Sequence, residues 1–191
     1  LLGSLVSLGY AAQDGETGKY RLTLKMFEIS SGIVNSMDVM SVAKVHLERL
    51  AQRTGEAVHL VIRDAQDIVY IYKTESGPMR MSSRVGLRSP LYCTGVGKAI
   101  LATLTEEEVE DVWRHSSPQK LTVRTVTDLP ALSRGLGDVY KRQPGPGGKA
   151  DSAFSISGLA PYMTPERIRR IAALALETRA DILRDLGVQG V

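Results

Sequence analysis

The sequence has little of the chemistry that marks a disulfide-linked or metal-dependent protein. It holds one cysteine, Cys93, and a single thiol can form neither an internal disulfide nor a Cys-rich zinc site. Its three histidines, His46, His59 and His115, are scattered without metal-ligand spacing. We therefore expect no metal and no cofactor, and we expect each histidine to be structural or to face solvent.

Long apolar runs are also missing. No stretch approaches the roughly 20 apolar residues that span a bilayer, and no charged-then-apolar leader is present. These absences predict a cytoplasmic protein with no membrane partner. Aromatic residues make up only 5% of the chain, so the core must be mainly aliphatic. With 191 residues, the chain is long enough for one ordinary domain plus an appendage. A net charge of +3 permits a nucleic-acid partner without requiring one.

The first 22 residues predict a helix followed by a hairpin. Leucines recur at helical spacing up to Gly9, and a polar, Gly-rich turn over 14–18 then separates two short strands. A helix followed at once by a cationic hairpin is typical of the back half of a winged helix. The candidate DNA contacts are Ser4 and Ser7 on the helix, and Lys19 and Arg21 on the hairpin. An ordinary surface hairpin fits the same residues.

The rest of the chain predicts an α+β domain. Residues 24–35 suit one helix, and a second helix, capped by Ser36 or Asp38, ends just before Gly55. The β-rich runs 57–62 and 68–72 form a hairpin, and 79–82 is a candidate third strand. We expect 87–93 to be irregular because of Pro90, followed by a helix over 98–104. A capping box then opens a helix at Thr105. A strand over 153–157 and a helix capped by Thr164 complete an antiparallel sheet with flanking helices.

The glycines before the 98–104 helix are the first candidate site. Backbone N–H groups at a Gly-rich helix start can bind an anion, and a carboxylate is a suitable ligand. A nucleotide phosphate loop is excluded, because Tyr92 and Ala99 stand where that motif needs glycine and Ser or Thr. The alternative is that Gly95 and Gly97 only allow close packing.

Two serines form the second candidate site. Strand alternation places Ser155 and Ser157 on one face, where two hydroxyls can hold a small polar ligand. An equally good interpretation is that both serines lie on the solvent-exposed face of an edge strand. No catalytic grouping accompanies these residues: the serines lack a nucleophile-elbow context, and no Cys–His pair is recognisable.

Taken together and in order, these segments resemble the IclR family of bacterial transcription regulators. The residues that carry the resemblance are Leu8-Gly9-Tyr10, Gly18-Lys19-Tyr20-Arg21-Leu22, Leu50-Ala51-Gln52-Arg53-Thr54-Gly55-Glu56, Ser83-Arg84-Val85-Gly86-Leu87-Arg88-Ser89-Pro90-Leu91, the 94–102 segment and Ser155-Ile156-Ser157-Gly158.

The resemblance implies a division into three parts. Residues 1–24 would be the end of a winged helix-turn-helix DNA-binding domain, 25–37 a linker helix, and 38–191 an effector-binding domain with a fold like GAF and PAS sensors. It also implies operator DNA as the partner of the full-length protein, and a homodimer or homotetramer as the assembly. Because the winged helix begins part-way through, we expect the chain to be a piece of a longer protein.

The resemblance further implies that the effector is a small carboxylic acid, sugar-derived or aromatic. The family pocket matches the helix start at Gly95 and Val96 and the strand serines Ser155 and Ser157, with Met81 as a wall position.

One segment departs from the family pattern. Residues 135–150 are turn-rich, and Pro144 and Pro146 make a core strand there implausible. We expect fewer strands and a more open pocket in consequence. The leading interpretation is a non-enzymatic, ligand-responsive transcription regulator. The alternatives are a metabolic enzyme that binds a small acid, and a truncated chain that neither senses nor binds DNA.

Overall fold

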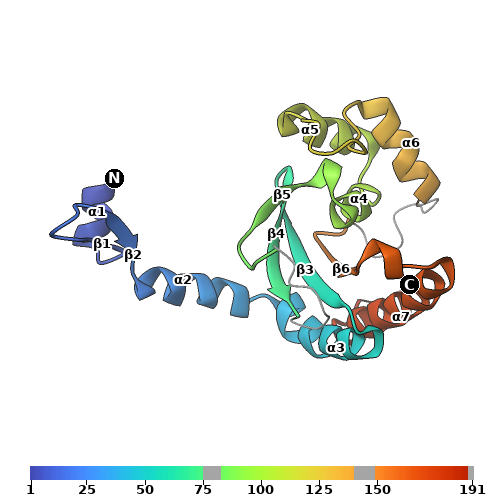
Figure 1. Cartoon of the computed structure of the whole chain (residues 1–191), viewed down its shortest axis with the longest axis horizontal. Helices are drawn as coiled ribbons and strands as arrows, with labels where there is room; N and C mark the ends of the chain where they lie inside the picture. Colours follow the sequence, from blue (N-terminus) through green and yellow to red (C-terminus); the bar gives the residue numbers. More distant parts are fainter. Residues whose placement is uncertain (75–82, 140–148, 189–191) are drawn as a thin grey trace. The chain divides into compact units, whose positions relative to one another are not determined.

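The computed structural model describes residues 1–74, 83–139 and 149–188. The chain divides into two compact units, Leu1–Ser41 and Val42–Val191 (Figure 1). The candidate strand at 79–82, and with it Met81, lies outside the described residues.

The first unit contains the predicted helix and hairpin. Helix α1 (Leu2–Ser7) is followed by the antiparallel pair β1 (Ala11–Gln13) and β2 (Tyr20–Leu22). Gly9 has a φ of +76°, the left-handed conformation that ends a helix at little cost in glycine. The Asp14 carboxylate holds the hairpin turn by accepting hydrogen bonds from the backbone and hydroxyl of Thr17. Helix α2 (Leu24–Asn35) then confirms the predicted connecting helix.

The second unit is built on a four-stranded antiparallel sheet with the strand order β5-β4-β3-β6. Its strands are β3 (Ala57–Asp64), β4 (Asp67–Lys73), β5 (Arg88–Pro90) and β6 (Ser152–Ser157). The predicted hairpin and the predicted last strand are both confirmed. With its flanking helices, the sheet confirms the α+β class.

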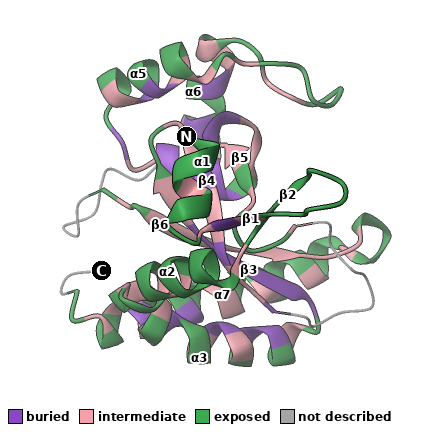
Figure 2. Ribbon diagram, turned by 90° about the vertical axis from the view of Figure 1, so that its left-hand side faces the viewer, coloured by how far each residue is buried: buried purple, intermediate pink, exposed green. Residues whose placement is uncertain are grey.

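Helices α3 (Asp38–Thr54) and α7 (Pro165–Asp185) lie together on one side of the sheet (Figure 1). The buried residues of α3 are Ala43, Leu47, Leu50 and Ala51, which recur at helical spacing (Figure 2). The Tyr72 hydroxyl donates to Glu48 of α3 at 2.8 Å, and burial together with this hydrogen bond raises the pKa of Tyr72 to about 12. His46 of α3 meets Asp185 of α7 at 2.8 Å. Thr164 caps α7 as predicted.

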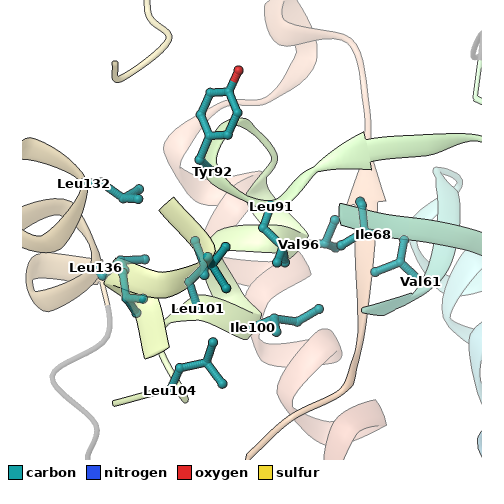
Figure 3. Close-up of a cluster of buried hydrophobic side chains, with 12 residues drawn as sticks. Val61, Ile68, Leu91, Tyr92, Val96, Ile100, Leu101, Leu104, Leu132 and Leu136 are labelled. Carbon is teal, nitrogen blue, oxygen red and sulfur yellow. The ribbon is translucent and has the colours of Figure 1, made fainter. Parts of the chain in front are cut away.

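The opposite side of the sheet carries the larger apolar core (Figure 3). It is covered by the 3-10 helix η1 (Leu91–Cys93), α4 (Gly95–Leu101), α5 (Glu106–Ser116) and α6 (Leu129–Val139). The buried cluster consists of Val61, Ile68, Leu91, Tyr92, Val96, Ile100, Leu101, Leu104, Val109, Val112, Leu132 and Leu136. The capping box of α5, between Thr105 and Glu108, is present as predicted. A short 3-10 helix, η2 (Ala160–Tyr162), precedes α7.

Three sequence predictions are wrong in part. Residues 87–93 are not wholly irregular, since β5 pairs with β4 and Pro90 lies opposite Asp67. Proline is tolerated there because β5 is an edge strand. Helix α4 begins at Gly95, three residues earlier than expected, and Thr94 caps it by accepting from the Gly97 N–H. The start of the turn-rich segment is helical, because α6 continues to Val139.

The chain is anchored where it re-enters the described structure. Lys149 forms an ion pair with Glu108, and the Ala150 N–H donates to the Thr103 hydroxyl at 3.0 Å. The ion pair, followed by the hydrogen bond from Thr105, lowers the pKa of Glu108 to about 2. The segment that leads into β6 is therefore attached next to the start of α5.

Candidate functional site

The two glycines of α4 have different surroundings. A Cβ atom at Gly97 would lie 2.6 Å from the Leu91 Cα and in conflict with the Leu91 carbonyl oxygen. Gly97 therefore supports the close-packing interpretation. Gly95 is exposed, and a Cβ atom there would meet nothing within 4 Å. Of the two, only Gly95 has open space beside it.

The cap of α4 determines which N–H groups at its start are engaged. The Thr94 hydroxyl accepts from Gly97, and the Thr94 carbonyl accepts from Lys98 at 3.0 Å. The first N–H groups of a helix have no carbonyl within the helix to bind. The N–H groups of Gly95 and Val96 are therefore without a helical partner. The Val96 side chain is buried in the apolar cluster.

Ser155 and Ser157 lie on the face of the sheet that α4 covers. In register, Ser155 is opposite His59 and Ser157 is opposite Ala57. Ala153, two residues before Ser155 on β6, packs against the cluster that contains Val96. Both serines are half-buried, and neither hydroxyl bonds to another described residue. β6 is an edge strand as the alternative interpretation supposed, but its serine-bearing face is only partly exposed.

His59 is a residue at this place that the sequence did not single out. It is 2% exposed. Its Nε2 lies 2.7 Å from the Ser83 hydroxyl, and its ring meets the Tyr70 ring edge-on at 5.6 Å between centroids. Burial, and then the nearby charge of Lys73, lower the pKa of His59. The only available signal was one polar residue inside the apolar run 57–62.

The four candidate DNA contacts are all exposed. Ser7 donates to the Ser4 carbonyl at 3.0 Å, a local bond that leaves both residues at the surface. Lys19 lies just before β2 and Arg21 lies within it. Among the residues that the structure describes, no carboxylate pairs with either cation.

Within residues 1–74, 83–139 and 149–188, no group of three metal-ligating side chains could hold a metal ion. Burial raises the pKa of the Cys93 thiol, which makes it a weaker nucleophile. Within the same ranges, every helix is too short or too polar to traverse a bilayer.

One open groove, with a volume of about 460 Å³, lies between the end of α3 and the start of α7. It is lined by Arg53, Thr54, Thr164, Glu166, Arg167, Arg170, Ile171 and Leu174. None of the predicted site residues lines this groove.

Comparison with known proteins identifies the family of this chain. Residues 31–144 match the family described as the C-terminal domain of the bacterial transcriptional regulator IclR. The chain belongs to the IclR family. This confirms the resemblance seen in the sequence.

The IclR relatives are regulators and repressors rather than enzymes. The HTH-type regulator KdgR of Escherichia coli is 39% identical over 142 residues, which cover 74% of this chain and 54% of KdgR. The HTH-type repressor AllR of Klebsiella pneumoniae is 32% identical over 99% of this chain and 77% of its own length. The chain therefore spans about half of KdgR and most of AllR. The metabolic-enzyme interpretation is not supported.

Solved structures show the same fold. The IclR protein of Thermotoga maritima has a TM-score of 0.79 at 28% identity, over 97% of this chain and 83% of that chain. The C-terminal domain of Escherichia coli KdgR has a TM-score of 0.66 at 27% identity, over 76% of this chain and 96% of that domain.

Proposed function

We propose that this IclR-family chain is the ligand-responsive part of a DNA-binding transcription regulator that acts in the cytoplasm. Residues 1–24 would contact operator DNA, 25–37 would link, and 38–191 would bind the effector. The observation that carries this proposal is the pair of half-buried, unbonded hydroxyls of Ser155 and Ser157 on the covered face of β6. Effector binding would shift the population of DNA-competent arrangements.

The effector proposed is a small organic acid, sugar-derived or aromatic. Its hydroxyl or ring substituents would meet the two serine hydroxyls, which can both donate and accept. Its carboxylate would meet the N–H groups of Gly95 and Val96, beside the open space at Gly95. Met81 remains a predicted wall residue outside the described part of the chain.

Replacing both serines by alanine is expected to abolish stabilisation by the effector. A thermal-shift screen would use acetate, lactate, pyruvate, gluconate, glucuronate and benzoate. At a hundredfold excess over the dissociation constant, a ligand adds about 2.7 kcal/mol, or roughly 5–10 °C in melting temperature for a domain of this size. Ser155→Ala with Ser157→Ala should remove this shift.

Ser152→Ala is the matched control, because alternation places Ser152 of β6 on the opposite face. It should keep the shift. An undiminished shift in the double variant would exclude the serines from the pocket. A sharp transition that no acid moves would contradict the acid-sensing proposal.

Lys19 is proposed to contact a DNA phosphate, together with Arg21. Lys19→Ala should weaken binding to duplexes of unrelated sequence about equally, and lower the slope of log K against log salt by about 1. Fluorescence anisotropy over a salt series measures both effects. Lys44→Ala, an exposed lysine in the other unit, should leave them unchanged. Weakening limited to one DNA sequence would contradict a phosphate contact.

Helix α2 supports the proposal of a homodimer, or of a homotetramer made from such dimers. None of its residues is buried, and Phe27 is 69% exposed. Leu24, Ile29 and Ile33 are also exposed, while Lys25 and Glu28 are the only charged residues of the helix. A second copy of α2 would bury these apolar residues and pair each lysine with a glutamate.

Sedimentation at micromolar concentration should find dimers or tetramers of this chain. Phe27→Lys with Ile33→Lys should give monomers, because four charges would then enter the apolar contact of a dimer. Leu121→Lys, at an exposed site in the other unit, is the control and should not alter the assembly. A monomeric unsubstituted chain would contradict the proposal.

A further inference from the structure

We propose that His59 is a third polar group of the effector pocket, and that the acid binds together with one proton taken up by this imidazole. The proposal rests on the function proposed above, since it concerns the same face of β6. It adds a residue and a form of regulation: the response to the effector would depend on pH.

The sheet register places His59 next to the serines. Ser155 lies directly opposite it on β6, and side chains at such positions have Cβ atoms about 5 Å apart on one face. A ligand held by the Ser155 hydroxyl therefore lies beside the imidazole.

One nitrogen of the ring is still available. Nε2 meets the Ser83 hydroxyl at 2.7 Å, whereas Nδ1 has no hydrogen-bond partner among the described residues. Solvent also reaches Nδ1. In the described ranges every fully buried side-chain nitrogen or oxygen has a hydrogen-bond partner, and Nδ1 has none. In the charged form both ring nitrogens donate, Nε2 to Ser83 and Nδ1 to an incoming acceptor.

The free pocket favours the neutral ring. Burial and the charge of Lys73, which lies opposite His59 on β4, lower the pKa of His59 from its ordinary value of 6.5. The negative charge of an acid bound in the same pocket would raise this pKa again. At a pH between the two values, binding takes up one proton, so affinity falls as the pH rises.

The other groups that face this position come from two sides. β4 contributes Tyr70 and Lys73, and β6 contributes only the serine hydroxyls. On the α4 side, Cys93 interacts with Tyr70, and Lys98 interacts with Cys93. Burial raises the pKa values of Tyr70 and Cys93. His59 is therefore the group of this set whose ordinary pKa lies nearest neutral pH, and the one whose charge a bound anion would change there.

The test is calorimetric titration of the full chain with the acid of the six-member panel that stabilises it most. Titrations in phosphate and in Tris, which have different ionisation enthalpies, count the protons taken up without any substitution. We expect net proton uptake at pH 7.5, of at most one proton for each acid bound, and an affinity that falls as the pH rises from 6.5 to 8.5, by at most about tenfold per pH unit.

His59→Gln keeps a hydrogen-bonding group near Ser83 but cannot take up a proton. It should bind the acid with the same dissociation constant throughout this pH range. His46→Gln is the control, because His46 lies on α3 and pairs with Asp185 of α7. It should retain both the proton uptake and the pH dependence.

The outcomes separate the two proposals. If an acid binds, and binding is lost in the Ser155/Ser157 double variant but takes up no proton, the role of His59 is overturned and the proposed function stands. If His59→Gln retains the pH dependence, the proton goes elsewhere and the inference is again overturned. If no acid of the panel binds, both proposals fail.

Discussion

Gly97→Ala should lower the free energy of unfolding of the second unit by about 3 kcal/mol, at the upper end of what overpacking costs. The added Cβ would be forced against the Leu91 backbone, 2.6 Å from its Cα. A backbone cannot swing aside as a flexible side chain does, so η1 and α4 would have to separate. Both contribute buried residues to the main cluster, among them Leu91 and Ile100. Urea unfolding followed by circular dichroism measures the loss.

Gly95→Ala is the matched control for this prediction, on the same helix and two residues away. It places a Cβ in open space, and alanine is the better helix former by up to about 1 kcal/mol. We expect a free energy of unfolding equal to or slightly above that of the unsubstituted chain. If the two variants are equally stable, the contact between Gly97 and Leu91 is not as close as the structure has it.

Arg167→Met should cost about 2–3 kcal/mol, because it leaves a buried carboxylate without its partner. Arg167 lies 2.5 Å from Glu56, whose side chain is only 8% exposed, and it also reaches the Thr54 carbonyl. The figure is below that for a fully buried pair because the Arg167 side chain is itself 41% exposed. Gly158 encloses the same carboxylate, since a Cβ there would lie 2.7 Å from the Glu56 Oε2.

Two further variants test the cause of this loss. Arg169→Met removes an arginine from the same helix, but its partner Glu166 is 75% exposed, so a change within about 0.5 kcal/mol is expected. Glu56→Gln combined with Arg167→Met should recover most of the stability, because an amide costs less to bury than a charge. Equal losses in the Arg167 and Arg169 variants would show that the lost ion pair is not the cause.

Local signals were enough to predict much of the fold. The start of α5 follows from a hydroxyl that caps it and a glutamate three residues later. The start of α7 follows from a threonine before a proline. The errors occur where distant residues decide. Pro90 predicted an irregular segment, yet pairing with β4 makes that segment an edge strand. Glycines disfavour a helix at 95–97, yet Val96 and Gly97 are held there by packing on η1.

The candidate site was predicted only in part for the same reason. Alternation was enough to put Ser155 and Ser157 on one face, but it did not say which face is covered. His59 lies in a run of apolar residues whose pattern distinguishes neither face. Its place beside Ser155 depends on the register between β3 and β6, which no short-range pattern contains. The helical start of the 135–150 segment did carry a missed signal, since Leu132 and Leu136 are one helical turn apart.

The pairing of Ala57 with Ser157 has a consequence for the order of folding. β3 and β4 can pair as soon as both strands have been made, but β6 can dock only after about eighty further residues have been made. Contacts this distant in sequence form slowly, because a long loop must close before they are gained. Until then, one edge of β3 has no neighbour, and an unpaired edge is prone to association with other chains. In this chain the strand that would bind the effector is also the one that completes the sheet, so an effector present during synthesis would favour the finished fold over its aggregation-prone precursor.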